Sequence, residues 1–105
     1  MQSTELISFQ IISAVGTARS MYIEAIQEAK KGNFEKAQEL IDEGEKIFNE
    51  GHHCHGELIQ QEASGNKTEF ELLLMHAEDQ LIVADAFKTI SEEFIDVYKT
   101  IKNKQ

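Results

Sequence analysis

Apolar side chains recur every three or four residues along most of the chain, and two short breaks interrupt the pattern. The breaks are Lys31-Gly32-Asn33 and Ser64-Gly65-Asn66. Each pairs a glycine suited to a helix C-cap with an asparagine that tolerates turn geometry. Because this spacing places side chains on one face of an α-helix, the pattern predicts three helices, at residues 4–31, 34–64 and 68–102.

The segments between the breaks are free of proline, so long uninterrupted helices are expected. Each would be a rod of roughly 40–50 Å at about 1.5 Å per residue. The third begins with Thr68, followed three residues later by Glu71, which is the spacing of a capping box. Short connections make sequential helices antiparallel neighbours, so residues 1–105 are expected to form one all-α domain of three long antiparallel helices.

The first two expected helices each carry one apolar stripe. In the first, the stripe consists of Ile7, Ile11, Ala14, Val15, Ala18, Met21, Ala25 and Ala29. In the second, it consists of Ala37, Leu40, Ile41, Gly44, Ile47, Phe48, Gly51, Leu58 and Ile59. We expect these faces to form the core.

The third expected helix has more apolar residues than a three-helix domain can bury. Its main stripe consists of Leu72, Val83, Phe87, Ile90, Phe94, Val97 and Ile101. In its N-terminal half, further apolar residues face the side where water is expected, namely Leu74, Ala77, Leu81 and Ile82. A helix that is apolar nearly all round is buried on several sides, so we expect this half to contact other subunits.

Composition narrows the choice of partner and of compartment. The 10 basic and 19 acidic residues give a net charge of −9. This balance argues against nucleic acid or an anionic membrane and favours a basic protein partner. Cys54 is the single cysteine, and the N-terminus has no signal-peptide pattern. No apolar run is longer than the four residues of Leu72–Met75, which is too short to cross a bilayer. We therefore expect a cytoplasmic protein that does not insert into membranes.

The residues that suggest chemistry are His76 and Asp79, which fall inside the apolar stripe, with Gln80 at its edge. Burying such polar groups without partners is unfavourable, so their clustering indicates a structural or functional role for these residues. One interpretation is a structural hydrogen-bonded pair of His76 and Asp79. The other is a nucleophilic imidazole that accepts a phosphoryl group, with apolar neighbours that exclude water. The chain has no Gly-rich phosphate loop, so the phosphoryl donor would be another protein.

Three stretches together resemble one known family. Residues 73–81, Leu-Leu-Met-His-Ala-Glu-Asp-Gln-Leu, look like the active-site segment of the enzyme IIA component of the lactose/cellobiose (lactose/N,N'-diacetylchitobiose) class of the bacterial phosphoenolpyruvate-dependent sugar phosphotransferase system. Residues 16–20 resemble the Gly-x-Ala-Arg-Ser segment of the family's first helix, and residues 58–65 resemble the end of its second. The likeness covers essentially the whole chain in unbroken order.

The resemblance implies a homotrimeric helical bundle in which His76 is phosphorylated. It implies that Asp79 from three subunits converges around a divalent cation on the threefold axis, for which Mg²⁺ suits carboxylate oxygens. The histidine-containing phosphocarrier protein would supply the phosphoryl group, and a cysteine of enzyme IIB would receive it during uptake of a cellobiose-, lactose- or chitobiose-type disaccharide. Gln80 is a candidate donor to the phosphoryl oxygens or a rim residue.

The run His52-His53-Cys54-His55 departs from the family, since His55 and Gly56 replace an expected Gln and Thr. On a helix, His55 would point into the packed stripe, His52 would lie at its edge and His53 would face solvent. A structural zinc site needs about four converging ligands. Because these side chains diverge, a variation in packing is favoured over a zinc or copper site.

Residues 32–37, Gly-Asn-Phe-Glu-Lys-Ala, resemble part of a tetratricopeptide helix pair. A repeat array requires at least three units of roughly 34 residues, and the chain offers one candidate pair. The alternative function is thus a tetratricopeptide-like helical adaptor that carries out no chemical reaction.

Overall fold

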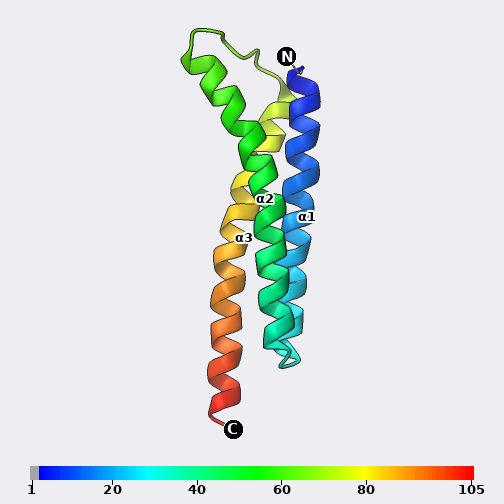
Figure 1. The fold of residues 1–105 in the computed structure, drawn as a ribbon, viewed down its shortest axis with the longest axis vertical. Helices are drawn as coiled ribbons and strands as arrows, with labels where there is room; N and C mark the ends of the chain where they lie inside the picture. Colours follow the sequence, from blue (N-terminus) through cyan, green and yellow to red (C-terminus); the bar gives the residue numbers. More distant parts are fainter. Residues whose placement is uncertain (1–2) are drawn as a thin grey trace.

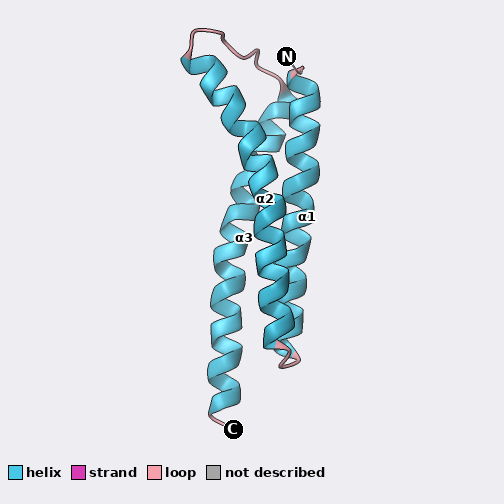
Figure 2. Ribbon diagram, in the orientation of Figure 1, coloured by secondary structure: helices cyan, strands magenta, loops and turns pink. Residues whose placement is uncertain are grey.

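The protein forms an elongated bundle of three helices, which a computed structural model describes for residues 3–105 (Figure 1). The helices are α1 (Thr4–Lys30), α2 (Phe34–Ala63) and α3 (Leu72–Asn103), and the described residues contain no strand (Figure 2). The bundle measures 58 × 20 × 18 Å. The predicted all-α class and the three antiparallel helices are confirmed.

The first break closes α1 with a Schellman motif. Gly32 has a φ of 87°, its N–H donates to the carbonyl of Ala29 at 3.0 Å, and the N–H of Asn33 donates to the carbonyl of Glu28 at 2.9 Å. Gly65, with a φ of 98°, ends α2 with the same pair of backbone bonds. Positive φ strains any residue with a Cβ, so the two glycines are what allow the sharp reversals.

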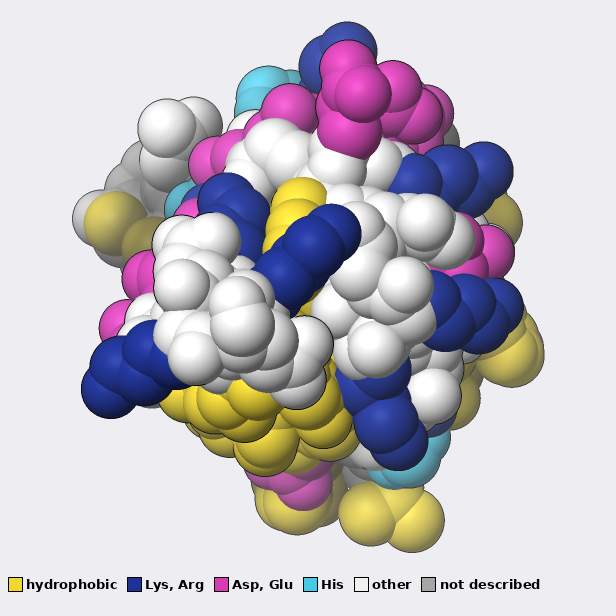
Figure 3. All heavy atoms as spheres, turned by 90° about the horizontal axis from the view of Figure 1, so that it is seen from below, with side chains coloured by type: hydrophobic (Ala, Val, Ile, Leu, Met, Phe, Trp, Pro, Cys, Tyr) yellow, Lys and Arg dark blue, Asp and Glu magenta, His cyan; other side chains and the backbone are white. Residues whose placement is uncertain are grey.

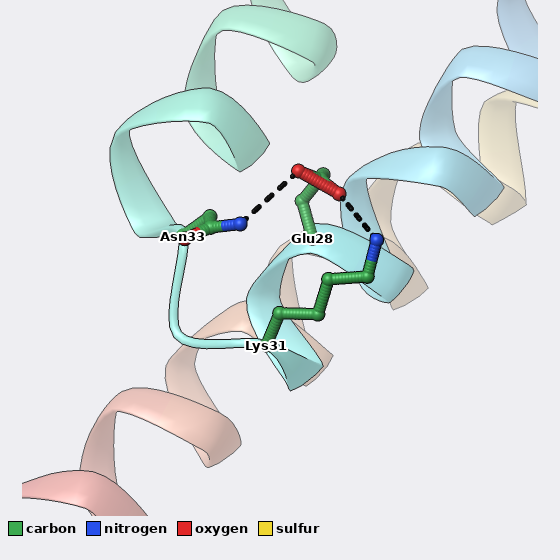
Figure 4. Close-up of polar contacts among 3 residues, drawn as sticks. All are labelled: Glu28, Lys31 and Asn33. Atoms are coloured by element: carbon green, nitrogen blue, oxygen red, sulfur yellow. Dashed lines mark hydrogen bonds and ion pairs between the residues drawn. The ribbon is translucent and has the colours of Figure 1, made fainter.

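Side chains reinforce the first turn (Figure 4). The Glu28 carboxylate accepts hydrogen bonds from Nζ of Lys31 at 3.2 Å and from Nδ2 of Asn33 at 3.3 Å. These bonds lower the pKa of the Glu28 carboxyl, with Lys31 the larger cause. Asn33 therefore ties the turn back to α1 instead of capping α2 with its side chain.

The predicted capping box at Thr68 is wrong. Helix α3 begins at Leu72, and Glu71 occupies the N-cap position in an extended conformation without a side-chain capping bond. In Figure 1 the last turns of α2 lean away from α1, and residues 64–71 cross the end of the bundle to reach α3. The chain needs Thr68 and its neighbours for that crossing, so they are not available to form a helical turn.

Helix α1 packs along both other helices, whereas α2 and α3 contact each other less. Two glycines bring α2 close to α1. A Cβ on Gly44 would lie 2.7 Å from Cε1 of Tyr22, and one on Gly51 would lie 3.0 Å from Cγ1 of Val15. The two expected stripes on α1 and α2 supply most of the buried core, as predicted.

Most of the main stripe of α3, which was expected to be buried, is instead exposed, and of its residues only Phe87 packs on the core. Leu74, Ala77 and Leu81, expected on an outer face, pack on the core together with Ala84 and Ile95. The small side chains of Ala77 and Ala84, both fully buried, allow the α3 backbone to pack closely on the core, while many larger apolar residues of α3 lie outside. Those exposed residues, here called the outer stripe, are Leu72, Met75, Ile82, Val83, Ile90, Phe94, Val97 and Ile101.

The outer stripe runs the length of α3, so the apolar excess is not confined to the N-terminal half as expected. Figure 3, seen from the end that carries the C-terminus, shows hydrophobic side chains gathered on one side of the bundle, with lysines around them. Among the described helices, none has an apolar window long enough to cross a membrane.

Candidate functional site

The candidate site lies on the first turns of α3, at the N-terminal end of the outer stripe. An open groove of about 510 Å³ is lined by Leu72, Leu73, Met75, His76 and Asp79. The α-helical spacing of three residues puts His76 and Asp79 on the same face. The structure therefore brings His76 and Asp79, two of the three predicted site residues, together in one groove.

Both side chains are exposed, in contrast to the expectation that they lie in a buried stripe. The reason is that the stripe itself faces outward on the subunit. Within residues 3–105 no hydrogen bond joins His76 to Asp79, so the structural-pair interpretation has no support. The His76 ring can be reached from solvent, as a phosphoryl acceptor requires.

Gln80 follows His76 by one helical turn and is half-buried. Its i, i+4 relation makes it a neighbour of His76 along α3, but Gln80 is not among the residues that line the groove. An amide carries two N–H donors, so Gln80 can donate to an anionic group held on the His76 ring.

One subunit alone does not supply enough ligands to hold a hard cation at Asp79, so such a site requires Asp79 from several subunits. In the described part of one subunit, no three His, Cys, Asp or Glu side chains converge. Ile82 and Val83 of the outer stripe follow Asp79 by three and four residues, so they neighbour it on the same exposed face of α3. If another subunit covers this stripe, the carboxylate loses water and requires a counter-charge, which a divalent cation supplies.

Behind the groove, a contact that the sequence analysis missed joins α2 to α3. Nε2 of His55 lies 2.7 Å from Oε2 of Glu78, a hydrogen-bond distance for a ring N–H donating to a carboxylate. The His55 side chain is 18% exposed and that of Glu78 is 47% exposed. The sequence shows that Glu78 lies two residues after His76, which marks it as a residue close to the site. Local spacing cannot show that its partner is His55, because the two residues are 23 positions apart in the chain.

The other histidines of the run lie on the surface of α2. His52 stacks on Phe48, with ring centroids 6.1 Å apart. His53 faces solvent and lies 3.2 Å from Oε1 of Glu57, which confirms its predicted direction.

Cys54 and His55 point to different helices. Sγ of Cys54 lies 3.8 Å from Oε1 of Gln10 in α1, and burial is the main cause that raises the pKa of the thiol. His55 points to α3, which confirms that it faces the packed side. The run therefore spreads its side chains over separate neighbours, as a packing surface does.

Comparison with known proteins gives a family match over most of the chain. Residues 6–99 match the family described as "PTS system, Lactose/Cellobiose specific IIA subunit". The lichenan-specific phosphotransferase enzyme IIA component of Bacillus subtilis (strain 168) is 39% identical over 104 residues, covering 99% of this chain and 94% of the relative. The lactose-specific EIIA component of Staphylococcus aureus (strain N315) is 32% identical over 98 residues, covering 93% of this chain and 95% of the relative.

Solved structures agree with the sequence match. The crystal structure of the PTS cellobiose-specific enzyme IIA from Bacillus anthracis is similar over 100% of this chain and 97% of that chain, with a TM-score of 0.94 and 44% identity. The IIA(Chitobiose) of the Escherichia coli IIA(Chitobiose)–HPr complex is similar over 97% of this chain and 99% of that chain, with a TM-score of 0.84 and 27% identity.

Proposed function

Because the chain belongs to the lactose/cellobiose-specific IIA subunit family of the phosphotransferase system, we propose that it carries a phosphoryl group on His76 during sugar uptake. The observation that carries this proposal is the exposed His76 side chain in an open groove with apolar walls. A histidine ring nitrogen is a nucleophile near neutral pH, and apolar walls slow hydrolysis of the phosphorylated ring.

The phosphoryl donor is HPr, the histidine-containing phosphocarrier protein. The similar Escherichia coli IIA(Chitobiose) is described in a complex with HPr, which supports this partner. A ring nitrogen of His76 attacks the phosphorus, a new N–P bond forms, and the donor's N–P bond breaks with its electron pair returning to the donor imidazole. Such a transfer depends on positioning two nucleophiles in line across an interface.

In the second transfer, the phosphoryl group passes to a cysteine thiolate of the cognate enzyme IIB. An S–P bond forms while the N–P bond to His76 breaks, and the electron pair returns to the His76 ring. Gln80 donates a hydrogen bond to the phosphoryl oxygens while the group is held. The acidic net charge of −9 favours basic surfaces on both partners.

The working unit is a homotrimer in which the outer stripes of three subunits cover one another. This arrangement removes the exposed apolar surface of α3 from water. Asp79 from the three subunits holds a divalent cation, with Mg²⁺ suited to carboxylate oxygens. The cation, when bound, supplies the positive charge that three neighbouring carboxylates need.

The sugar is a disaccharide of the cellobiose, lactose or chitobiose type, and the protein works in the cytoplasm. Relatives and similar structures described as lichenan-, lactose- and cellobiose-specific support this class of sugar. The tetratricopeptide adaptor has no comparable support, because the family match extends over residues 6–99.

A phosphorylation assay tests the proposal. The protein is incubated with phosphoenolpyruvate, enzyme I and HPr, and its intact mass is measured at neutral pH. We expect a gain of one phosphate that acid removes and that His76→Ala abolishes. A wild-type chain that gains no phosphate contradicts the proposal.

A further inference from the structure

Helix α3 presents His76 on one side and is held to α2 on the other. Glu78 lies two positions after His76, and successive helical residues are turned by about 100°. Glu78 therefore points away from the groove, and its carboxylate meets the ring of His55 at 2.7 Å. The direction of His76 is thus coupled to the contact behind it.

This contact lies near the end of the packed part of α2. Leu58 is the last buried residue of α2, at 5% exposed, and Figure 1 shows the following turns leaning away from the bundle. The first turn of α3 also lacks a side-chain cap at Glu71. Among the described residues, the His55–Glu78 contact is the one hydrogen bond or ion pair that joins the first turns of α3 to α2.

We infer that His55 is a positioning residue for phosphoryl transfer, acting through Glu78 to fix the rotation of the first turns of α3 and hence the direction of His76. The inference rests on the proposed function of His76. In-line transfer between two proteins is sensitive to displacements of about 1 Å, which can change the rate by about a hundredfold. The His55 side chain is 18% exposed, so it acts from behind the groove rather than by touching a docked partner.

The chain offers a matched control on the same two helices. Nζ of Lys88 in α3 lies 3.3 Å from Oε1 of Glu45 in α2. The Glu45 side chain is 48% exposed, close to the 47% of Glu78. Lys88 lies ten residues beyond Glu78, about 15 Å along α3 at 1.5 Å per residue, so this pair is remote from His76.

The test compares His55→Ala, Glu78→Ala and the double variant with Glu45→Ala. Phosphorylated HPr is the donor, and kcat and KM for phosphoryl acceptance are measured beside the melting temperature. We expect kcat to fall about ten- to hundredfold in each of the first three variants, with KM within about twofold of wild type. The double variant should be no slower than the slower single variant, because the single and double variants all lose the same His55–Glu78 contact. Glu45→Ala should keep the wild-type kcat.

A conservative variant separates positioning from folding. The amide N–H of His55→Gln can donate to Glu78, so this variant should recover most of the wild-type kcat. Helical circular dichroism at the assay temperature confirms which variants are folded. If an alanine variant is unfolded, the comparison of Glu78→Leu with Glu45→Leu replaces it. Leucine favours a helix but cannot accept the hydrogen bond from His55, so the same loss of kcat is expected for Glu78→Leu alone.

Two results would overturn the positioning role. The first is that the folded variants His55→Ala and Glu78→Ala, or Glu78→Leu in their place, keep the kcat of wild type and show only a lowered melting temperature. The contact would then be purely structural. The second is a wild-type protein that accepts no phosphate, which removes the proposed function and the positioning role together. Slow variants beside an active wild type and an active Glu45→Ala support the inference.

Discussion

The ring of Tyr22 occupies the space beside Gly44 so closely that a Cβ at Gly44 would lie 2.7 Å from Cε1. Tyr22 is fully buried, so its ring cannot swing aside. The close approach of α1 and α2 therefore depends on the missing side chain at position 44. At Gly56, on the same helix, no atom beyond the adjoining residues and the backbone of its own helical turns lies within 4 Å of the place where a Cβ would lie.

Gly44→Ala is expected to destabilise the protein by about 1–3 kcal/mol, because the added methyl overpacks the contact with Tyr22. Gly56→Ala is expected to stabilise it by about 0.5–1 kcal/mol, because alanine restricts the unfolded chain and favours a helix. Thermal unfolding of the two variants beside wild type measures both effects. Equal changes of the same sign would contradict the packing described at Gly44.

Alkaline pH tests the burial of the Tyr22 hydroxyl. Burial is the largest cause that raises the pKa of Tyr22 from 10.0 to about 12, followed by the negative charge of Glu45. Because the folded state holds the phenol proton more tightly than the unfolded state, this stability is complete below pH 10.0 and is lost as the pH rises through about 12. Urea unfolding of wild type and Tyr22→Phe should show the steeper alkaline loss in wild type. Parallel pH profiles would mean that the phenol is not shielded from water.

The outer stripe predicts self-association through α3. Sedimentation equilibrium should give three times the chain mass of 11.9 kDa at micromolar concentration. Val97→Glu places an unpaired charge in the covered stripe, which is strongly unfavourable, and should dissociate the assembly. Asn49→Glu, on the exposed surface of α2, is the control that should leave the mass unchanged. A wild-type protein that stays monomeric would contradict the trimer.

Asp79→Leu tests the axial cation. Replacing clustered carboxylates by apolar groups of similar size is often neutral or stabilising, so the variant should remain trimeric and lose its dependence on divalent cations. Melting temperatures with and without EDTA make the comparison. If Asp79→Leu unfolds while the metal-stripped wild type remains folded, Asp79 has a different role.

Local signals in the sequence account for what could be predicted. The three helices and their two breaks follow from apolar spacing and from Gly-Asn pairs, which act within a few residues. His76 and Asp79 stand out because a polar pair within an apolar stripe is also a local feature. Their proximity in one groove is confirmed by the structure.

Features that depend on distant parts of the chain could not be predicted. Thr68 has the sequence of a cap, but the path from α2 to α3 across the end of the bundle decides where α3 begins. Both faces of α3 are apolar, so periodicity alone cannot say that Ala77 packs inward while Val83 faces out. The His55–Glu78 contact requires knowing how α2 and α3 align.

The central claim, that His76 carries the phosphoryl group, is tested most directly by mapping the modified residue. After phosphorylation by HPr, the protein is digested at neutral to alkaline pH, which preserves phosphohistidine, and its peptides are sequenced by tandem mass spectrometry. The chain has four histidines, so His52, His53 and His55 serve as internal controls beside His76. We predict one phosphate per chain, on His76 alone, and none in His76→Gln. Phosphate on any residue of the 52–55 run, or a fully phosphorylated His76→Gln variant, would contradict the assignment of His76.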